Sequence, residues 1–222
     1  TAGGSAAGAA GAGAGCGAGP AFQDHVRKVV DDVKGKESVD LGRAFNDSLG
    51  VLSRNAGTLL LAGLLSGLLS FASAFILAGP LTCGMYAMLL RVLRHRQDVE
   101  IGDLFGSFDR FWSKMIAFYV LLIGILIGLA HVVVPGIVIA ALTMYVFPIL
   151  AERKVGFGEA LSESASAVWK HGLLMHAVLI TIVMMMDVAA GTMLPGGILA
   201  SWLLTPFLSG LVASAWLQVQ EK

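Results

Sequence analysis

The sequence predicts an all-α membrane protein, a polytopic bundle of six spans arranged as three hairpins, each preceded by an interfacial amphipathic helix. Three observations predict this fold. Hydrophobic residues make up 56% of the 222 residues and charged residues only 14%, more apolar surface than one soluble core can bury. Apolar segments recur that approach the roughly 20 residues needed to cross a hydrocarbon core about 30 Å thick. The third observation is an internal repeat.

The repeat is a unit that opens with an apolar residue followed by glycine. The three openings are Leu41-Gly42, Ile101-Gly102 and Phe157-Gly158. Apolar residues then continue at helical spacing with charged residues between them, so we expect each opening to form a helix along the membrane surface with its apolar face in the lipid. A connecting helix packed on protein is the alternative. The three repeats are 41–100, 101–156 and 157–222.

Two apolar segments follow each opening. The expected spans are 56–78, 80–93, 114–134, 135–151, 173–194 and 196–217. The second is short, because Arg91 lies only eleven positions after Pro80. Either the Arg91 side chain snorkels to the interface, or Gly79-Pro80 is a kink in a helix that begins near Ala72. We favour a turn at Gly79-Pro80, since Pro80 and Pro135 lie at nearly the same distance before the next opening.

The paired spans are joined by short connections rich in Pro and Gly. They are Gly79-Pro80, Pro135-Gly136 and Pro195-Gly196-Gly197, where glycine relieves the backbone and proline fixes its direction. None contains a charged residue, whereas Lys and Arg lie in the N-terminal segment, near the openings, at the inner ends of spans or at Lys222. The positive-inside rule then places both termini and the three amphipathic helices in the cytoplasm.

The N-terminal segment is expected to lie outside the membrane domain, which comprises residues 41–222. Residues 1–20 are almost entirely Gly, Ala and Ser and are predicted to be a disordered linker. Residues 21–40 are predicted to form a short amphipathic cytoplasmic helix and a linker. The helix has three alternative docking surfaces, the cytoplasmic face of the domain, the bilayer and a partner protein. The chain opens on Thr1, which leaves open an upstream domain.

The later part of the chain resembles a known group of proteins. The resemblance is carried by Pro135-Gly136-Ile137, Pro148-Ile149-Leu150-Ala151-Glu152 and Gly158-Glu159-Ala160-Leu161 with Ser164. These segments resemble uncharacterised six-span bacterial membrane proteins related to the membrane domain of some glycerophosphoryl diester phosphodiesterases. The likeness covers roughly residues 41–220 through diffuse patterning. It implies a bacterial cytoplasmic (inner) membrane protein without a defined activity, and the chain has no room for the phosphodiesterase catalytic domain.

Motifs for catalysis or metal binding are missing from the sequence. Cys16 and Cys83 stand alone, so there is no paired-cysteine metal pattern. There is also no phosphate loop, no His-Glu-x-x-His motif and no nucleophile elbow. The formal net charge is zero and indicates no nucleic-acid partner. We therefore expect no enzyme, no metal and no cofactor.

Asp187 is the candidate for an intramembrane polar site. It is the only acidic residue inside an expected span, and ionisable groups at such depth are costly and usually face a bundle interior or a water-filled cavity. His131, near the same end of the third span, is its candidate partner. The alternatives are a proton or cation site and a structural hydrogen bond to Asp187 from a neighbouring Ser, Thr or His. Arg91 is the candidate contact for a lipid phosphate, with snorkelling as the alternative.

Two classes of function follow from these observations. The first is a non-catalytic integral membrane protein that organises lipids or partner proteins through its interfacial helices, and it is the one we expect. The second is a small proton- or ion-coupled transporter or channel that uses Asp187. Gly63 and Gly67 have the Gly-x-x-x-Gly spacing of close helix packing, which serves either the bundle itself or a homo-oligomer.

Overall fold

The computed structural model describes residues 39–95, 97–131, 133–193 and 196–221, and these form helices with no strand among them. The all-α prediction is therefore confirmed for the described residues. The expected linker and nearly all of the expected helix before residue 41 lie outside them. The helices are α2 (Leu41–Arg54), α3 (Ala56–Ala72), α4 (Ala78–His95), the 3₁₀ helix η1 (Ile101–Ser107), α5 (Phe111–His131), α6 (Val133–Thr143), α7 (Val146–Glu152), α8 (Phe157–His171), α9 (Leu173–Met193) and α10 (Gly197–Gln220).

Four helical segments are long and apolar enough to cross a membrane. They are Phe111–Gly128, Val134–Glu152, Leu173–Thr192 and Gly197–Gln220, and they coincide with the last four expected spans. α2 and α3 qualify together as a fifth, but they are bent by 98° to one another. The described residues thus contain four to five helices of spanning length and composition, consistent with a multi-pass membrane protein.

The first hairpin turn lies earlier in the chain than predicted. α3 ends at Ala72, and the backbone then reverses through Ala74 and Phe75, whose φ angles are 50° and 66°. The prediction of a turn at Gly79-Pro80 is wrong, because both residues lie in the first turn of α4. The N–H groups of a first helical turn have no partner within the helix, so proline is tolerated there.

The second connection shows the same shift, and the third lies near its predicted place. Pro135 is the third residue of α6, as Pro80 is of α4, so the two prolines are equivalent although neither forms the turn. Gly196 adopts a left-handed conformation with φ 76° and precedes the first residue of α10. Glycine adopts the left-handed conformation at little cost in free energy.

The three openings form different structures. The third forms the helix α8, whose buried residues Ala160, Ser164 and Val168 pack chiefly against α7 and α6. The position of α8 along a membrane surface stays a prediction. The second forms the short η1, and the chain then turns at Arg110, which has φ 50°. α2 packs its buried residues Ala44, Ser48 and Val51 against the rest of the chain, chiefly α10, so the alternative of a helix packed on protein applies to the first opening.

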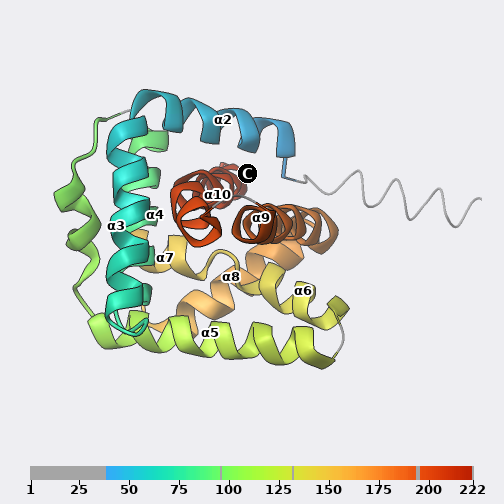
Figure 1. The fold of residues 1–222 in the computed structure, drawn as a ribbon. Coiled ribbons are helices and arrows are strands. Elements are labelled where there is room, and N and C mark those ends of the chain that lie inside the picture. The colour runs from blue at the N-terminus through green and yellow to red at the C-terminus, as the bar shows by residue number, and fades with distance from the viewer. Residues whose placement is uncertain (1–38, 96, 132, 194–195, 222) are drawn as a thin grey trace, which may run out of the picture. The chain divides into compact units, whose positions relative to one another are not determined.

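The long helices run in different directions. In Figure 1, α3 and α4 run side by side, α5 lies across their lower end, and α10 is seen nearly along its axis. The α3–α4 turn lies against the first half of α5, where the Tyr119 hydroxyl donates to the Ala74 carbonyl at 3.3 Å. A Cβ added to Gly79 would lie 2.2 Å from the Lys114 carbonyl oxygen. Because glycine has no side chain, the backbone of α5 can lie directly on α4.

The buried core and the apolar surface belong to different helices. α10 is buried without interruption from Pro206 to Trp216, and Gly63 and Gly67 of α3 pack against Trp202 and Pro206 of α10. The Gly-x-x-x-Gly spacing therefore serves packing within the chain. By contrast, only 22% of the apolar window of α5 and 17% of that of α9 is buried. Such apolar surfaces are suited to lipid.

Candidate functional site

Asp187 lies on the exposed side of α9 near the start of α10. Its Oδ1 accepts a hydrogen bond from the Ser201 hydroxyl of α10, so the pair joins α9 and α10. One of the two alternatives for Asp187 was a structural hydrogen bond from a neighbouring Ser, Thr or His, and the bond from Ser201 is a contact of this kind. His131 is the last residue of α5, and its pairing with Asp187 stays a prediction.

Arg91 has a protein partner in η1. Its Nη1 donates to Oδ1 of Asp103 at 2.6 Å, while the other carboxylate oxygen of Asp103 accepts from the Glu100 backbone N–H at 3.1 Å. The Glu100 N–H and the Arg91 guanidinium hold the pKa of Asp103 below its usual value. Arg91 therefore fastens η1 to α4, and its guanidinium is already paired with a carboxylate.

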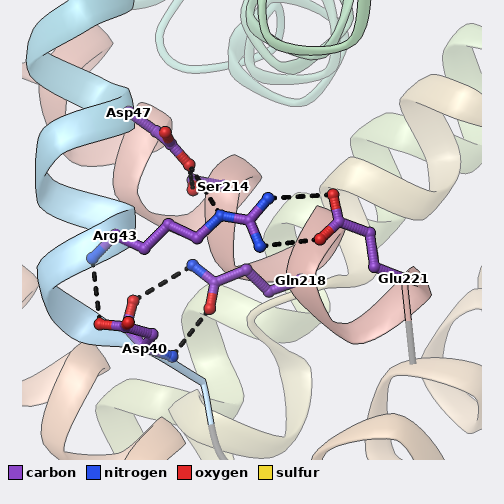
Figure 2. Close-up of polar contacts among 6 residues, drawn as sticks. All are labelled: Asp40, Arg43, Asp47, Ser214, Gln218 and Glu221. Carbon is purple, nitrogen blue, oxygen red and sulfur yellow. Dashed lines mark hydrogen bonds and ion pairs between the residues drawn. The ribbon is translucent and has the colours of Figure 1, made fainter.

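The C-terminal end of α10, with its cap Glu221, is joined to α2 and its cap Asp40 by a network of six residues. Figure 2 shows Arg43 reaching from α2 to Glu221, with Asp47 on its other side. The Arg43 guanidinium donates to both Glu221 oxygens, at 2.8 and 3.1 Å. Ser214 donates to Asp47 at 2.7 Å, and Gln218 exchanges two hydrogen bonds with the backbone of Asp40. Exposed ion pairs contribute little energy, so this network chiefly fixes the direction of α2.

Glu152, the last residue of α7, is the centre of a second network. One carboxylate oxygen accepts from the guanidinium of Arg94 in α4. The other accepts from Trp216 Nε1 and from Gln220 Nε2 of α10, both at 2.9 Å. Arg94 also donates to the Gln220 side chain. The Glu152 carboxylate thus links α7 to α4 and α10, two helices distant from it in the sequence. Its charge-assisted hydrogen bonds are stronger than neutral ones.

A polar cleft of about 880 Å³ opens beside the Glu152 network. The network forms one wall of the cleft. The other wall is the polar face of α8, whose members recur at helical spacing: Glu159, Ser162, Glu163, Ser166 and Lys170. The cleft thus offers a group of polar side chains from α8 to a ligand.

Most charges around the cleft are already paired. Glu152 binds Arg94, and Glu163 accepts from Arg153 at 2.7 Å. Lys170 is exposed and has no hydrogen-bond or ion-pair partner among the described residues. Ser166 lies one turn before Lys170 on the same face of α8, so a hydroxyl and an ammonium group are available together.

Buried aromatic residues lie behind the cleft wall. The Tyr145 ring packs against Trp216 and His176 with centroid distances of 5.2 and 5.5 Å. His176 is fully buried, and its Nδ1 donates to the Gly172 carbonyl at 2.8 Å. Neither Tyr145 nor Trp216 was identified as a site residue from the sequence, because their neighbours come from helices far apart in the chain.

Comparison with protein-family models, with curated proteins and with solved structures finds no match to this chain. The function therefore has to be argued from the geometry of the site.

Proposed function

We propose that the chain is a non-catalytic integral membrane protein that binds phospholipid headgroups in the polar cleft along α8. The single observation that carries this proposal is Lys170, unpaired among the described residues, beside Ser166 in the cleft. Arg94 is paired with Glu152 and Arg153 with Glu163. Glu159, the cleft carboxylate that has no partner among the described residues, lies about three helical turns from Lys170 along α8. An ammonium group with an adjacent hydroxyl suits a phosphate group. The internally paired charges act as a scaffold for this site.

The surroundings of Lys170 support a lipid phosphate over a soluble anion. Trp169, the preceding residue, is 63% exposed and Leu174, in the first turn of α9, is 62% exposed. Tryptophan is enriched at the membrane interface, and α9 is one of the helices of spanning length. A phospholipid can therefore place its phosphate at Lys170 while its hydrocarbon lies along the apolar face of α9.

The proposal also includes the orientation of the chain in the membrane. A phosphate site at the charged helix ends suits the cytoplasmic face of a bacterial inner membrane, with both termini cytoplasmic, as the positive-inside rule predicts. Six spans would require α3 and α4 to cross as well. α3 has 17 residues and α4 ends in Arg94 and His95, so this hairpin is the part of the topology that most needs a direct test.

Lys170→Gln tests the headgroup site. In detergent-purified protein, native mass spectrometry should detect binding of dihexanoyl phosphatidylglycerol and dihexanoyl phosphatidylethanolamine, weakened about tenfold in the variant because the only unpaired cation of the α8 face is lost. Lys154→Gln, which removes an exposed lysine outside the cleft, should bind like the wild type.

The competing explanations give different results. Equal binding by Lys170→Gln and wild type would contradict the proposal. Competition by millimolar inorganic phosphate, with no preference for the lipids, would identify a free-phosphate site instead. Cross-linking of a protein to a photoreactive residue at position 166, without lipid binding, would identify a protein partner.

A further inference from the structure

We propose a second binding site, an apolar cavity between α5 and α9 that takes one acyl chain of a membrane lipid. The cavity has a volume of about 290 Å³ and shares no lining residue with the polar cleft. It is therefore independent of the headgroup site.

The cavity wall is built for hydrocarbon. α5 contributes Phe118 and Leu121, α9 contributes Val183 and Met184, and α10 contributes Leu208 and Val212. The few polar atoms in the wall are already bonded within the chain. Thr143, for example, donates to the Ile139 carbonyl at 2.8 Å. A polar solute would find few free partners there, whereas an alkyl chain needs none.

The size of the cavity suits part of an acyl chain. An apolar cavity of about 150 Å³ is large enough to take benzene. At the same volume per carbon atom, 290 Å³ holds roughly ten to twelve carbons. An alkyl chain that fills the cavity gains contacts with its apolar wall, so such an occupant is favoured.

The opening of the cavity faces the surface expected to contact lipid. Lining residues from α10 and α6 are buried, as Val212 and Ala140 show, each 3% exposed. Except for the buried Leu121, those from α5 and α9 are partly exposed or exposed, and Leu122 of α5 reaches 39%. α5 and α9 are also the spanning helices with the smallest buried fractions. The occupant we assign is therefore a chain from the surrounding bilayer.

Val183→Phe tests the assignment by filling the cavity from α9. The probe is palmitic acid with a photoactivatable diazirine at mid-chain, added to membranes that contain the full chain. Irradiation should label α10 at Leu208 and Val212, which are 6% and 3% exposed and line the cavity. The variant should reduce this labelling at least tenfold. Val188→Phe is the matched control, since Val188 is on the same helix, 62% exposed and outside the cavity, and it should leave the labelling unchanged.

Three results would overturn the proposal. They are no label on Leu208 or Val212 in the wild type, equal label in Val183→Phe and wild type, and a cross-linked dimer that shows a second copy of the chain occupying the cavity. Ala140→Leu fills the same space from α6 and serves if Val183→Phe does not fold. Lys170→Gln should not affect the labelling, so the two sites can fail separately.

Discussion

Replacing Gly84 with alanine is expected to lower the free energy of unfolding by about 3 kcal/mol, the upper part of the range for overpacked cores. A Cβ at this position would lie 1.9 Å from the Leu104 carbonyl oxygen of η1. The clash is with backbone, which cannot rotate away, so α4 and η1 must separate. Separation also strains the Arg91–Asp103 ion pair between them. Thermal unfolding in detergent, followed by circular dichroism, measures the loss.

Gly124→Ala is the matched control. Gly124 lies inside α5 and an added Cβ would meet no atom within 4 Å. Alanine has the higher helix propensity by about 1 kcal/mol, so this variant should be as stable as the wild type or more stable. If Gly84→Ala were equally well tolerated, η1 would not lie on α4 as described.

Replacing Glu152 with alanine is expected to cost about 2 kcal/mol, because it leaves the buried indole N–H of Trp216 without an acceptor. The change removes the acceptor for Arg94, Trp216 and Gln220 together. Trp216 is 2% exposed, so its indole N–H cannot turn to water. Trp216 fluorescence, compared in a variant that keeps it as the only tryptophan, should shift as the ring loses its fixed position.

Glu152→Gln separates charge from hydrogen bonding. The amide oxygen keeps an acceptor for Trp216 but loses the charge that binds Arg94, so the loss of stability should be smaller than for alanine. Equal stability of Glu152→Ala and wild type would show that the network does not hold α4, α7 and α10 together.

The positions of the long apolar helices in the chain could be predicted from the sequence, but the directions in which they pack against one another could not. Apolar length alone located α5, α9 and α10, since span length is a local property. The repeat suggested three similar hairpins, yet Gly79 and Gly84 allow the backbone of residues 104–114 to lie on α4. This backbone contact requires glycine at both positions of α4 and a partner segment further along the chain. The periodicity of apolar residues predicts neither the contact nor the partner.

The prolines could also be only partly interpreted from the sequence. Pro80 and Pro135 were correctly matched to each other, but proline is compatible with both a turn and a first helical turn. Similarly, Asp187 could be recognised as the lone acid of its span, while its hydroxyl partner, Ser201, lies 14 residues away. The cleft could not be predicted at all, because its two walls come from α8 and from the ends of α4, α7 and α10.

Cysteine accessibility across the membrane tests the central claim, that α9 crosses the bilayer with its charged end and its turn on opposite sides. Lys170→Cys and Thr192→Cys place thiols at exposed positions near the two ends of α9, in a chain whose Cys16 and Cys83 are replaced by alanine. A membrane-impermeant maleimide should label Thr192→Cys only in intact spheroplasts and Lys170→Cys only in inverted vesicles. In the same assay, Ile76→Cys reports on which side of the membrane the α3–α4 turn lies. If the chain has six spans, the maleimide should label Ile76→Cys from the same side as Thr192→Cys. Labelling of positions 170 and 192 from the same side would contradict the account.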